Sequence, residues 1–178
     1  MSAAILHVPD EQRDRYLPGV LAVAASEQQR AQSQMIHHEA EFFTRYYGAG
    51  GDTCVAVLAG RVVAYALLAT PERLHAIWTP RAARLGLERG RCGCVVQVAV
   101  APEARRRGLA TALLERLRDV ARARGLAHLF ATVAPDNVAS VRTFERSGFR
   151  RFELATVYSE QVVRALFHGR LEPVESVQ

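Results

Sequence analysis

The first fifty residues change from strand-like to helix-like hydrophobic spacing. Residues 4–8 form a short apolar run that Pro9 closes, which predicts an edge strand. Over residues 11–47 the apolar positions recur with helical spacing. Breaks near Pro18-Gly19 and around Ser26 divide this stretch, so the pattern predicts two helices.

Two β-rich runs follow. Residues 54–58 and 62–69 are separated by Ala59-Gly60-Arg61, which predicts a tight hairpin, and Pro71 ends its second strand. Residues 72–91 have no clean period. We expect a loop with one helical turn there.

The second half of the chain alternates strand and helix patterns. A strand over residues 92–101 leads into an amphipathic helix over residues 107–124. The remaining elements are a strand over 129–133, a helix over 137–146, a strand over 149–158, and a segment 161–171 whose period fits a strand or a helix. Together these patterns predict one mixed α/β sheet in a single domain spanning residues 1–178.

Alternation along the predicted strand at residues 92–101 assigns its side chains to two faces. One face is expected to carry Cys92, Cys94, Val96 and Val98, and the other Val95, Gln97 and Ala99. The positions that would face a substrate are therefore mainly apolar.

The charge balance first suggests a nucleic-acid partner. The chain has 178 residues, of which 49% are hydrophobic, and its 23 basic and 18 acidic residues give a net charge of +5. It contains no lysine and a single asparagine, Asn137, a bias typical of a GC-rich coding sequence. We expect no nucleic-acid binding, because aromatic and basic residues are not interleaved and no helix-turn-helix or RNA-binding signature is present.

Cysteine spacing and hydropathy bear on metal binding and on the cellular compartment. Cys54 and the pair in Cys92-Gly-Cys94 are odd in number and lack metal-ligand spacing, so they predict reduced thiols in strands and no metal site. His37-His38 with Glu41 fits a solvated helix face better than a ligand set. No apolar run approaches the roughly 20 residues of a membrane span, and no secretory leader begins the chain. We expect a cytoplasmic protein without a membrane partner.

Residues 98–114 carry the most informative pattern. A strand runs into a loop with Arg105-Arg106-Arg107, Gly108 supplies a small-residue turn, and a helix follows. Free backbone N–H groups and the positive helix end converge at such a junction, which predicts an anion site. Gly108 would let a ligand approach the backbone, Ala110 would keep the first turn narrow, and Thr111 would add a hydroxyl. An arginine run alone is usually a solvated turn, but this context favours the anion site.

This stretch resembles the GCN5-related N-acetyltransferase (GNAT) superfamily, whose signature is Arg/Gln-x-x-Gly-x-Gly/Ala after a central strand. Arg105-x-x-Gly108-x-Ala110 matches it. A second family motif places a small residue three positions after an Asn, and Gly-Phe eleven and twelve positions after it. Asn137, Ser140 and Gly148-Phe149 occupy those places. The resemblance covers roughly residues 53–150.

The resemblance implies a mixed, mostly antiparallel central sheet flanked by helices, with acetyl-CoA as the acyl-donor co-substrate. Backbone groups of Val98 and Val100 would pair with the pantetheine amides, as a sheet edge pairs with an added strand. Amides from residues 105–110 would hold the pyrophosphate. The expected cofactor-binding residues are Val98, Val100, Arg105, Arg106, Arg107, Gly108, Leu109, Ala110, Thr111, Asn137, Ser140 and Phe144. A helix N-cap is an equally good role for Asn137, and the two roles are compatible.

Phe144 stands where the family usually has a tyrosine that hydrogen-bonds the thioester sulfur. Because phenylalanine has no hydroxyl, water or another group must deliver the proton to the leaving thiolate. Tyr158 is the candidate acid, and a strand tyrosine with a solvent-facing hydroxyl is the alternative. Glu103, directly after the central strand, is the candidate general base, and a solvated loop glutamate is the alternative.

We therefore expect an N-acetyltransferase that moves acetyl from acetyl-CoA to a primary amine of a small molecule or peptide by direct attack in a ternary complex. Tyr46, Tyr47 and Trp78 are candidates for the wall of the acceptor pocket, and core packing explains them as well. A catalytically weak acyl-CoA-binding or regulatory domain on the same fold is the alternative, which Phe144 favours. We also expect a homodimer.

Overall fold

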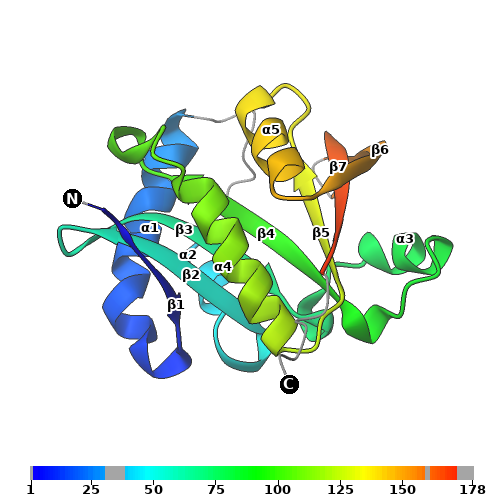
Figure 1. Ribbon diagram of the computed structural model, residues 1–178, viewed down its shortest axis with the longest axis horizontal. Helices are drawn as coiled ribbons and strands as arrows, with labels where there is room; N and C mark the ends of the chain where they lie inside the picture. The colour runs from blue at the N-terminus through cyan, green and yellow to red at the C-terminus, as the bar shows by residue number, and fades with distance from the viewer. Residues whose placement is uncertain (1, 31–38, 159–160, 172–178) are drawn as a thin grey trace, which may run out of the picture.

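A seven-stranded mixed sheet with the spatial order β1-β2-β3-β4-β5-β7-β6 forms the centre of the protein (Figure 1). The computed structural model describes residues 2–30, 39–158 and 161–171. Neighbouring strands are antiparallel except β4 and β5, which run parallel, so the mixed and mostly antiparallel sheet is confirmed. The strands are β1 (Ala4–Val8), β2 (Gly51–Leu58), β3 (Arg61–Ala69), β4 (Cys92–Val100), β5 (His128–Val133), β6 (Arg150–Val157) and β7 (Val162–Arg170).

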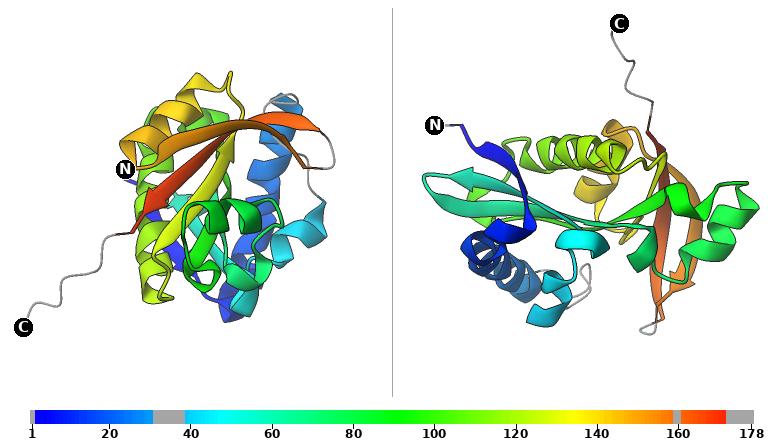
Figure 2. Two further views of the ribbon diagram at one scale, coloured as in Figure 1. Left: turned by 90° about the vertical axis from the view of Figure 1, so that its right-hand side faces the viewer. Right: turned by 90° about the horizontal axis from the view of Figure 1, so that it is seen from below.

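Helices cover both faces of this sheet, as the edge-on view in Figure 2 shows. One face, called here the α1 face, is covered by α1 and α2, and the other, the α4 face, by α4 and α5. Each face buries its own hydrophobic cluster against the sheet. The helices are α1 (Arg13–Arg30), α2 (Ala40–Thr44), α3 (Trp78–Arg84), α4 (Leu109–Ala123) and α5 (Val138–Arg146).

The α1 helix is continuous, which corrects the predicted break at Pro18-Gly19. A proline inside a helix removes one backbone hydrogen bond, but burial of neighbouring side chains such as Val20 and Val23 offsets that cost. Gly19 has a packing role, because a Cβ there would lie 2.7 Å from the Cβ of Val62 on β3. The predicted second helix is described only from Glu39 onward, as the short α2.

The predicted hairpin is confirmed and its turn is shorter than expected. Leu58 pairs with Arg61, so only Ala59 and Gly60 form the connection. Both have positive φ angles, 49° and 77°, as a two-residue turn matching the twist of antiparallel strands requires.

The structure shows the secondary structure of the two segments whose sequence patterns are ambiguous. The last segment is strand β7, and it lies between β5 and β6 instead of at the sheet edge. Residues 72–91 contain the helix α3, which is longer than the single turn predicted. Trp78 anchors α3, since its ring is fully buried and stacks on Phe130 of β5 with centroids 4.7 Å apart.

A β-bulge at Val96 corrects the predicted alternation of β4. On β3, Leu68 pairs with Val95 and Leu67 pairs with Gln97, so Val96 has no partner there. Side chains after the bulge exchange faces. Gln97 joins Cys94 on the α1 face, and Val98 joins Val95 on the α4 face.

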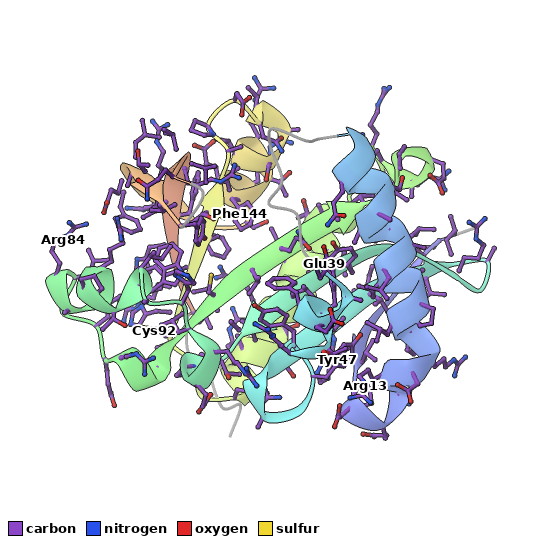
Figure 3. All side chains as sticks on the ribbon, turned by 180° about the vertical axis from the view of Figure 1, so that it is seen from behind. Arg13, Glu39, Tyr47, Arg84, Cys92 and Phe144 are labelled. Atoms are coloured by element: carbon purple, nitrogen blue, oxygen red, sulfur yellow. The ribbon has the colours of Figure 1, made fainter. Side chains whose placement is uncertain are left out.

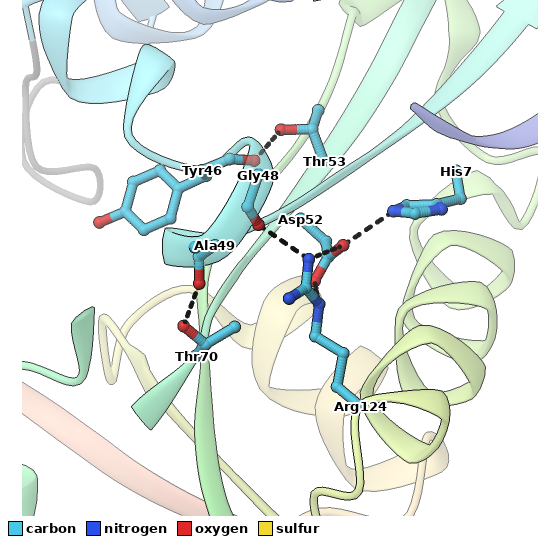
Figure 4. Close-up of polar contacts among 8 residues, drawn as sticks. All are labelled: His7, Tyr46, Gly48, Ala49, Asp52, Thr53, Thr70 and Arg124. Atoms are coloured by element: carbon cyan, nitrogen blue, oxygen red, sulfur yellow. Dashed lines mark hydrogen bonds and ion pairs between the residues drawn. The ribbon is translucent and has the colours of Figure 1, made fainter. Parts of the chain in front are cut away.

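A buried carboxylate ties β1 and β2 to the end of α4 (Figure 4). Asp52 of β2 is 3% exposed, and its Oδ1 lies 2.8 Å from His7 Nε2 on β1. The Arg124 guanidinium contacts the same carboxylate through Nε at 2.6 Å and also donates to the Gly48 carbonyl at 2.8 Å. Burial alone would raise the pKa of Asp52, but His7 and Arg124 outweigh it and hold that pKa below its ordinary value.

We predict that this cluster makes the fold acid-sensitive. A carboxyl group with a lowered folded-state pKa adds stability above its unfolded pKa, about 4, and that stability is lost as the pH falls through the folded pKa. Urea unfolding between neutral and acidic pH should show this loss. Asp52→Asn should lower the free energy of unfolding at neutral pH by about 2 kcal/mol and flatten the acid dependence.

The matched control is Asp119→Asn, which removes an exposed carboxylate paired with Arg122. It should cost less than about 1 kcal/mol. Identical pH profiles for the wild type and Asp52→Asn would contradict the assignment.

Candidate active site

The candidate site begins where β4 and β5 separate. Their parallel pairing runs from Cys92 opposite His128 to Val95 opposite Ala131 and then stops. Figure 1 shows the two strands diverging beyond that point. Past Val95, the edge of β4 that faces β5 has no strand partner among the residues the structure describes. We call this place the β4–β5 divergence.

Backbone groups of Val98 and Val100 point to this unpaired edge. The N–H of Ala101 donates to the carbonyl of Val63 on β3 at 2.8 Å. Because backbone groups alternate in direction along a strand, Val98 and Val100 turn theirs the other way. The Val100 carbonyl accepts from Arg105 Nε at 3.3 Å, which leaves the Val100 N–H and both backbone groups of Val98 directed to the unpaired edge.

The loop between β4 and α4 presents backbone amides at one end of the divergence. Arg106 and Gly108 both have left-handed backbone angles, φ 62° and 73°. The first amides of a helix lack intrahelical partners. Because the N-cap of α4 is Gly108, no side chain at that position caps them. A Cβ on Gly108 would meet no atom within 4 Å, so the space beside Gly108 is open. This arrangement fits an anion.

The three arginines of this loop differ in their surroundings. Arg105 forms an ion pair with Glu27 of α1, whose side chain is only 10% exposed. Arg106 and Arg107 are exposed beside the amides. The arginine of the family-like motif therefore anchors the loop to α1, while the other two supply charge to its solvent side.

On α5, Asn137 has the predicted capping role. Its Oδ1 accepts a hydrogen bond from the Ser140 N–H at 3.1 Å. Phe144 is 5% exposed, and its ring packs against Phe149 and Phe167 with centroids 5.1 and 6.0 Å away. Figure 3 shows Phe144 near the end of β5. A role of Asn137, Ser140 or Phe144 in cofactor binding stays a prediction.

Tyrosine hydroxyls gather at the other end of the divergence, on the α1 face. The Tyr158 hydroxyl lies 2.9 Å from Thr132 Oγ1 of β5, and its ring packs edge-on against His75. Burial raises the pKa of Tyr158 above its usual range, and Cys94 adds to the effect. Burial likewise raises the pKa of Tyr46 to about 12, again with a contribution from Cys94. Both phenols therefore stay protonated at neutral pH and can donate.

Glu103 lies far from this tyrosine pair along β4. It is an exposed residue of a single turn, Pro102–Ala104, between the end of β4 and the arginine loop. Tyr158 lies instead beside Cys94, where β4 and β5 still pair. The structure does not bring the two predicted catalytic residues together, and the role of Glu103 as general base stays a prediction.

A family profile decides the affiliation. The profile of the acetyltransferase (GNAT) family matches residues 21–149, which is most of the chain. The chain belongs to the acetyltransferase (GNAT) family. Its match to a curated relative is partial: it is 33% identical over 102 residues to the L-2,4-diaminobutyric acid acetyltransferase of Nocardia farcinica. That match covers 57% of this chain and 45% of the relative, less than half of its length.

Solved structures agree on the GNAT fold. The ribosomal-protein-S18-alanine N-acetyltransferase from Escherichia coli superposes with a TM-score of 0.65 at 19% identity, covering 99% of this chain and 98% of that one. A GCN5-related N-acetyltransferase from Kribbella flavida gives 0.70 at 20% identity, covering 96% and 98%. A Salmonella typhimurium protein solved with its cofactor acetyl-CoA gives 0.69 at 17% identity, covering 100% and 99%.

The arrangement in this GNAT chain fits acetyl-CoA. The unpaired edge at Val98 suits the amides of a pantetheine arm, and the loop at residues 105–110 suits a pyrophosphate. The described residues contain no group of three or more potential metal ligands. His37-His38 lies outside the described residues. No described helix is long and apolar enough to span a membrane.

The sequence patterns do not single out two polar residues near the divergence, Gln97 and Thr132. They also suggest a pocket role for Trp78 that its packing does not support. The predicted alternation places Gln97 on the wrong face, because a bulge leaves no mark in a run of β-formers. Thr132 was not considered, although a threonine in an otherwise apolar strand is a usable signal. Trp78 packs in the core, whereas Tyr46 lies near enough to Cys94 of β4 to feel its charge.

We predict that Gly108→Glu weakens acetyl-CoA binding at least tenfold. The side chain has room, so the fold should persist with about 1 kcal/mol of backbone strain, but it puts a repelling charge before the amides. Gly125→Glu is the matched control, since Gly125 also has a positive φ, 76°, and open space at the other end of α4. Calorimetry should show unchanged affinity in the control. Equal affinities for both variants would place the pyrophosphate elsewhere.

Proposed function

We propose that the protein is an N-acetyltransferase that moves acetyl from acetyl-CoA to a primary amine of a small molecule or peptide within a ternary complex. One observation carries the proposal: the unpaired edge of β4 leads directly into an amide-lined loop at a helix N-terminus. That combination matches the elongated shape of an acyl-CoA, with amides along its arm and phosphates at its end. Family membership and the name of the Nocardia relative support acetyl transfer.

Acetyl-CoA supplies an activated acetyl group, and its transfer to an amine releases the coenzyme as a thiol. The protein acts mainly by positioning acetyl-CoA and the amine. Backbone N–H groups at the Val96 bulge lie where they can polarise an acyl oxygen, and the residues of the 105–110 loop hold phosphates. Arg106 and Arg107 add charge from the solvent side.

Tyr158 is the proposed acid. Its hydroxyl is held by Thr132 and stays protonated, so it can give a proton to a leaving thiolate near Cys94. This replaces the hydroxyl that Phe144 lacks. The incoming amine loses its proton to water, and a chain of waters can pass that proton on to Glu103 beyond the end of β4.

A catalytically weak acyl-CoA-binding or regulatory domain is the second candidate. Two observations favour it. Phe144 is buried in an aromatic cluster without a hydroxyl, and Glu103 lies away from Tyr158. The two candidates differ in whether an amine is consumed.

The deciding measurement is thiol release from acetyl-CoA with a panel of amines, amino acids, polyamines, aminoglycosides and peptides. We expect one class to raise the release rate at least tenfold above the rate without acceptor. Acetyl-CoA binding without any acceptor-dependent release would favour the binding domain.

We also predict that Tyr158→Phe lowers kcat at least tenfold while acetyl-CoA affinity stays unchanged. General acid catalysis supports that size of effect, and the ring itself is kept. Tyr16→Phe on α1 is the control, because Tyr16 contacts Arg15 away from the divergence. A wild-type kcat in Tyr158→Phe would remove this residue from the mechanism.

We also propose that the protein forms a homodimer, does not bind nucleic acid and is located in the cytoplasm. Leu154 and Val163 on the outer β6–β7 hairpin are 60% and 50% exposed, which supports an assembly surface there. Sedimentation of the purified chain tests the dimer.

A further inference from the structure

Gln97 holds an unusual place on the α1 face. The bulge at Val96 turns its side chain toward α1, directly beside the β4–β5 divergence. The residue is 9% exposed and stands in a strand whose other buried side chains on this face are apolar or thiol. A buried amide in such surroundings is costly unless its hydrogen bonds are made.

Tyr65 makes one of those bonds and fixes the amide. Its hydroxyl donates to Gln97 Oε1 at 2.7 Å, and its ring is fully buried edge-on to Phe43 of α2. Burial raises the pKa of Tyr65 far above its usual range, so the phenol remains a donor. With Oε1 engaged, Gln97 offers only the N–H groups of Nε2, and no described residue accepts from them.

We infer that Gln97, oriented by Tyr65, binds the acceptor by donating from Nε2 to an oxygen beside the reacting amine. The acceptor then belongs to the amines with a neighbouring carboxylate or carbonyl, such as amino acids or peptides. Alkyl polyamines lack that oxygen. The inference rests on the proposed acetyltransferase function.

The charges around the tyrosine pair agree with this acceptor class. Arg45 and Arg73 are near enough to Tyr46 to act against the rise of its pKa, and Arg164 acts on Tyr158 in the same way. Arg45 and Arg73 are exposed, and such guanidinium groups attract a carboxylate and repel a polycation.

The test compares L-2,4-diaminobutyrate, its amide, and 1,3-diaminopropane, which is the same diamine without the carboxyl group. We expect kcat/KM for the acid or the amide to exceed that for the diamine at least tenfold, because a site built to bind an oxygen discriminates against an analogue lacking it. A high kcat/KM for the acid alone would identify a carboxylate site. A high kcat/KM for both the acid and the amide would identify a carbonyl site.

Variants then assign the discrimination to Gln97. Gln97→Met keeps the volume and removes the donor, so KM for the preferred acceptor should rise about tenfold while kcat and acetyl-CoA affinity hold. Kinetics with 1,3-diaminopropane should not change. Tyr65→Phe should move KM in the same direction by less, and the exposed Gln12→Met should match the wild type.

Three results would overturn the inference. The first is an equal kcat/KM for the acid, the amide and the diamine, and the second is an equal loss of kcat/KM for all three in Gln97→Met. The third is an unchanged KM in both Gln97→Met and Tyr65→Phe. If Gln97→Met fails to fold, Tyr65→Phe, which retains the packing, decides. Turnover without discrimination overturns only this inference. Failure of every amine to release thiol, with acetyl-CoA still bound, overturns the proposed function instead.

Discussion

The interrupted ladder between β4 and β5 is the constraint on which the site depends. Backbone N–H and C=O groups that leave water need partners, and β4 loses its β5 partners after Val95. The bulge at Val96 lies directly after this point, so the twist of β4 changes where pairing ends. On either side the sheet is paired from β1 to β4 and from β5 to β6, apart from the bulges. The described part of the sheet therefore presents an unpaired edge of β4 near its centre, and an amide-bearing ligand can complete it.

Several parts of this arrangement can be read from local sequence. The stretch around Arg105-x-x-Gly108-x-Ala110 predicted the junction of strand, loop and helix, because strand, turn and helix signals follow one another without a gap. Asn137 predicted its own helix cap for the same reason. The hairpin at Ala59-Gly60 is also local, since two residues with positive φ suffice. Each of these features needs only a few neighbouring residues.

Features that depend on distant contacts could not be read in this way. The orientation of Gln97 requires the register of β3 against β4, and the Tyr158 contact requires β5 and the turn after β6 to meet. The sequence predicts a helix break at Pro18, because the local cost of proline is visible in the sequence while the packing of α1 on the sheet is not. The final strand was ambiguous until its partners β5 and β6 were known.

The two ends of the divergence both lie near arginines but differ in burial, and each suits a different part of the proposed reaction. At the loop end, Arg106 and Arg107 are exposed, so their charge is available to phosphates at little desolvation cost. At the tyrosine end, burial outweighs the pull of nearby guanidinium groups and keeps Tyr46 and Tyr158 neutral. A fully exposed phenol beside the same cations would ionise more easily and would hold its proton less firmly before the reaction. Burial at this end therefore allows cations that attract a carboxylate to lie next to a group that must keep its proton.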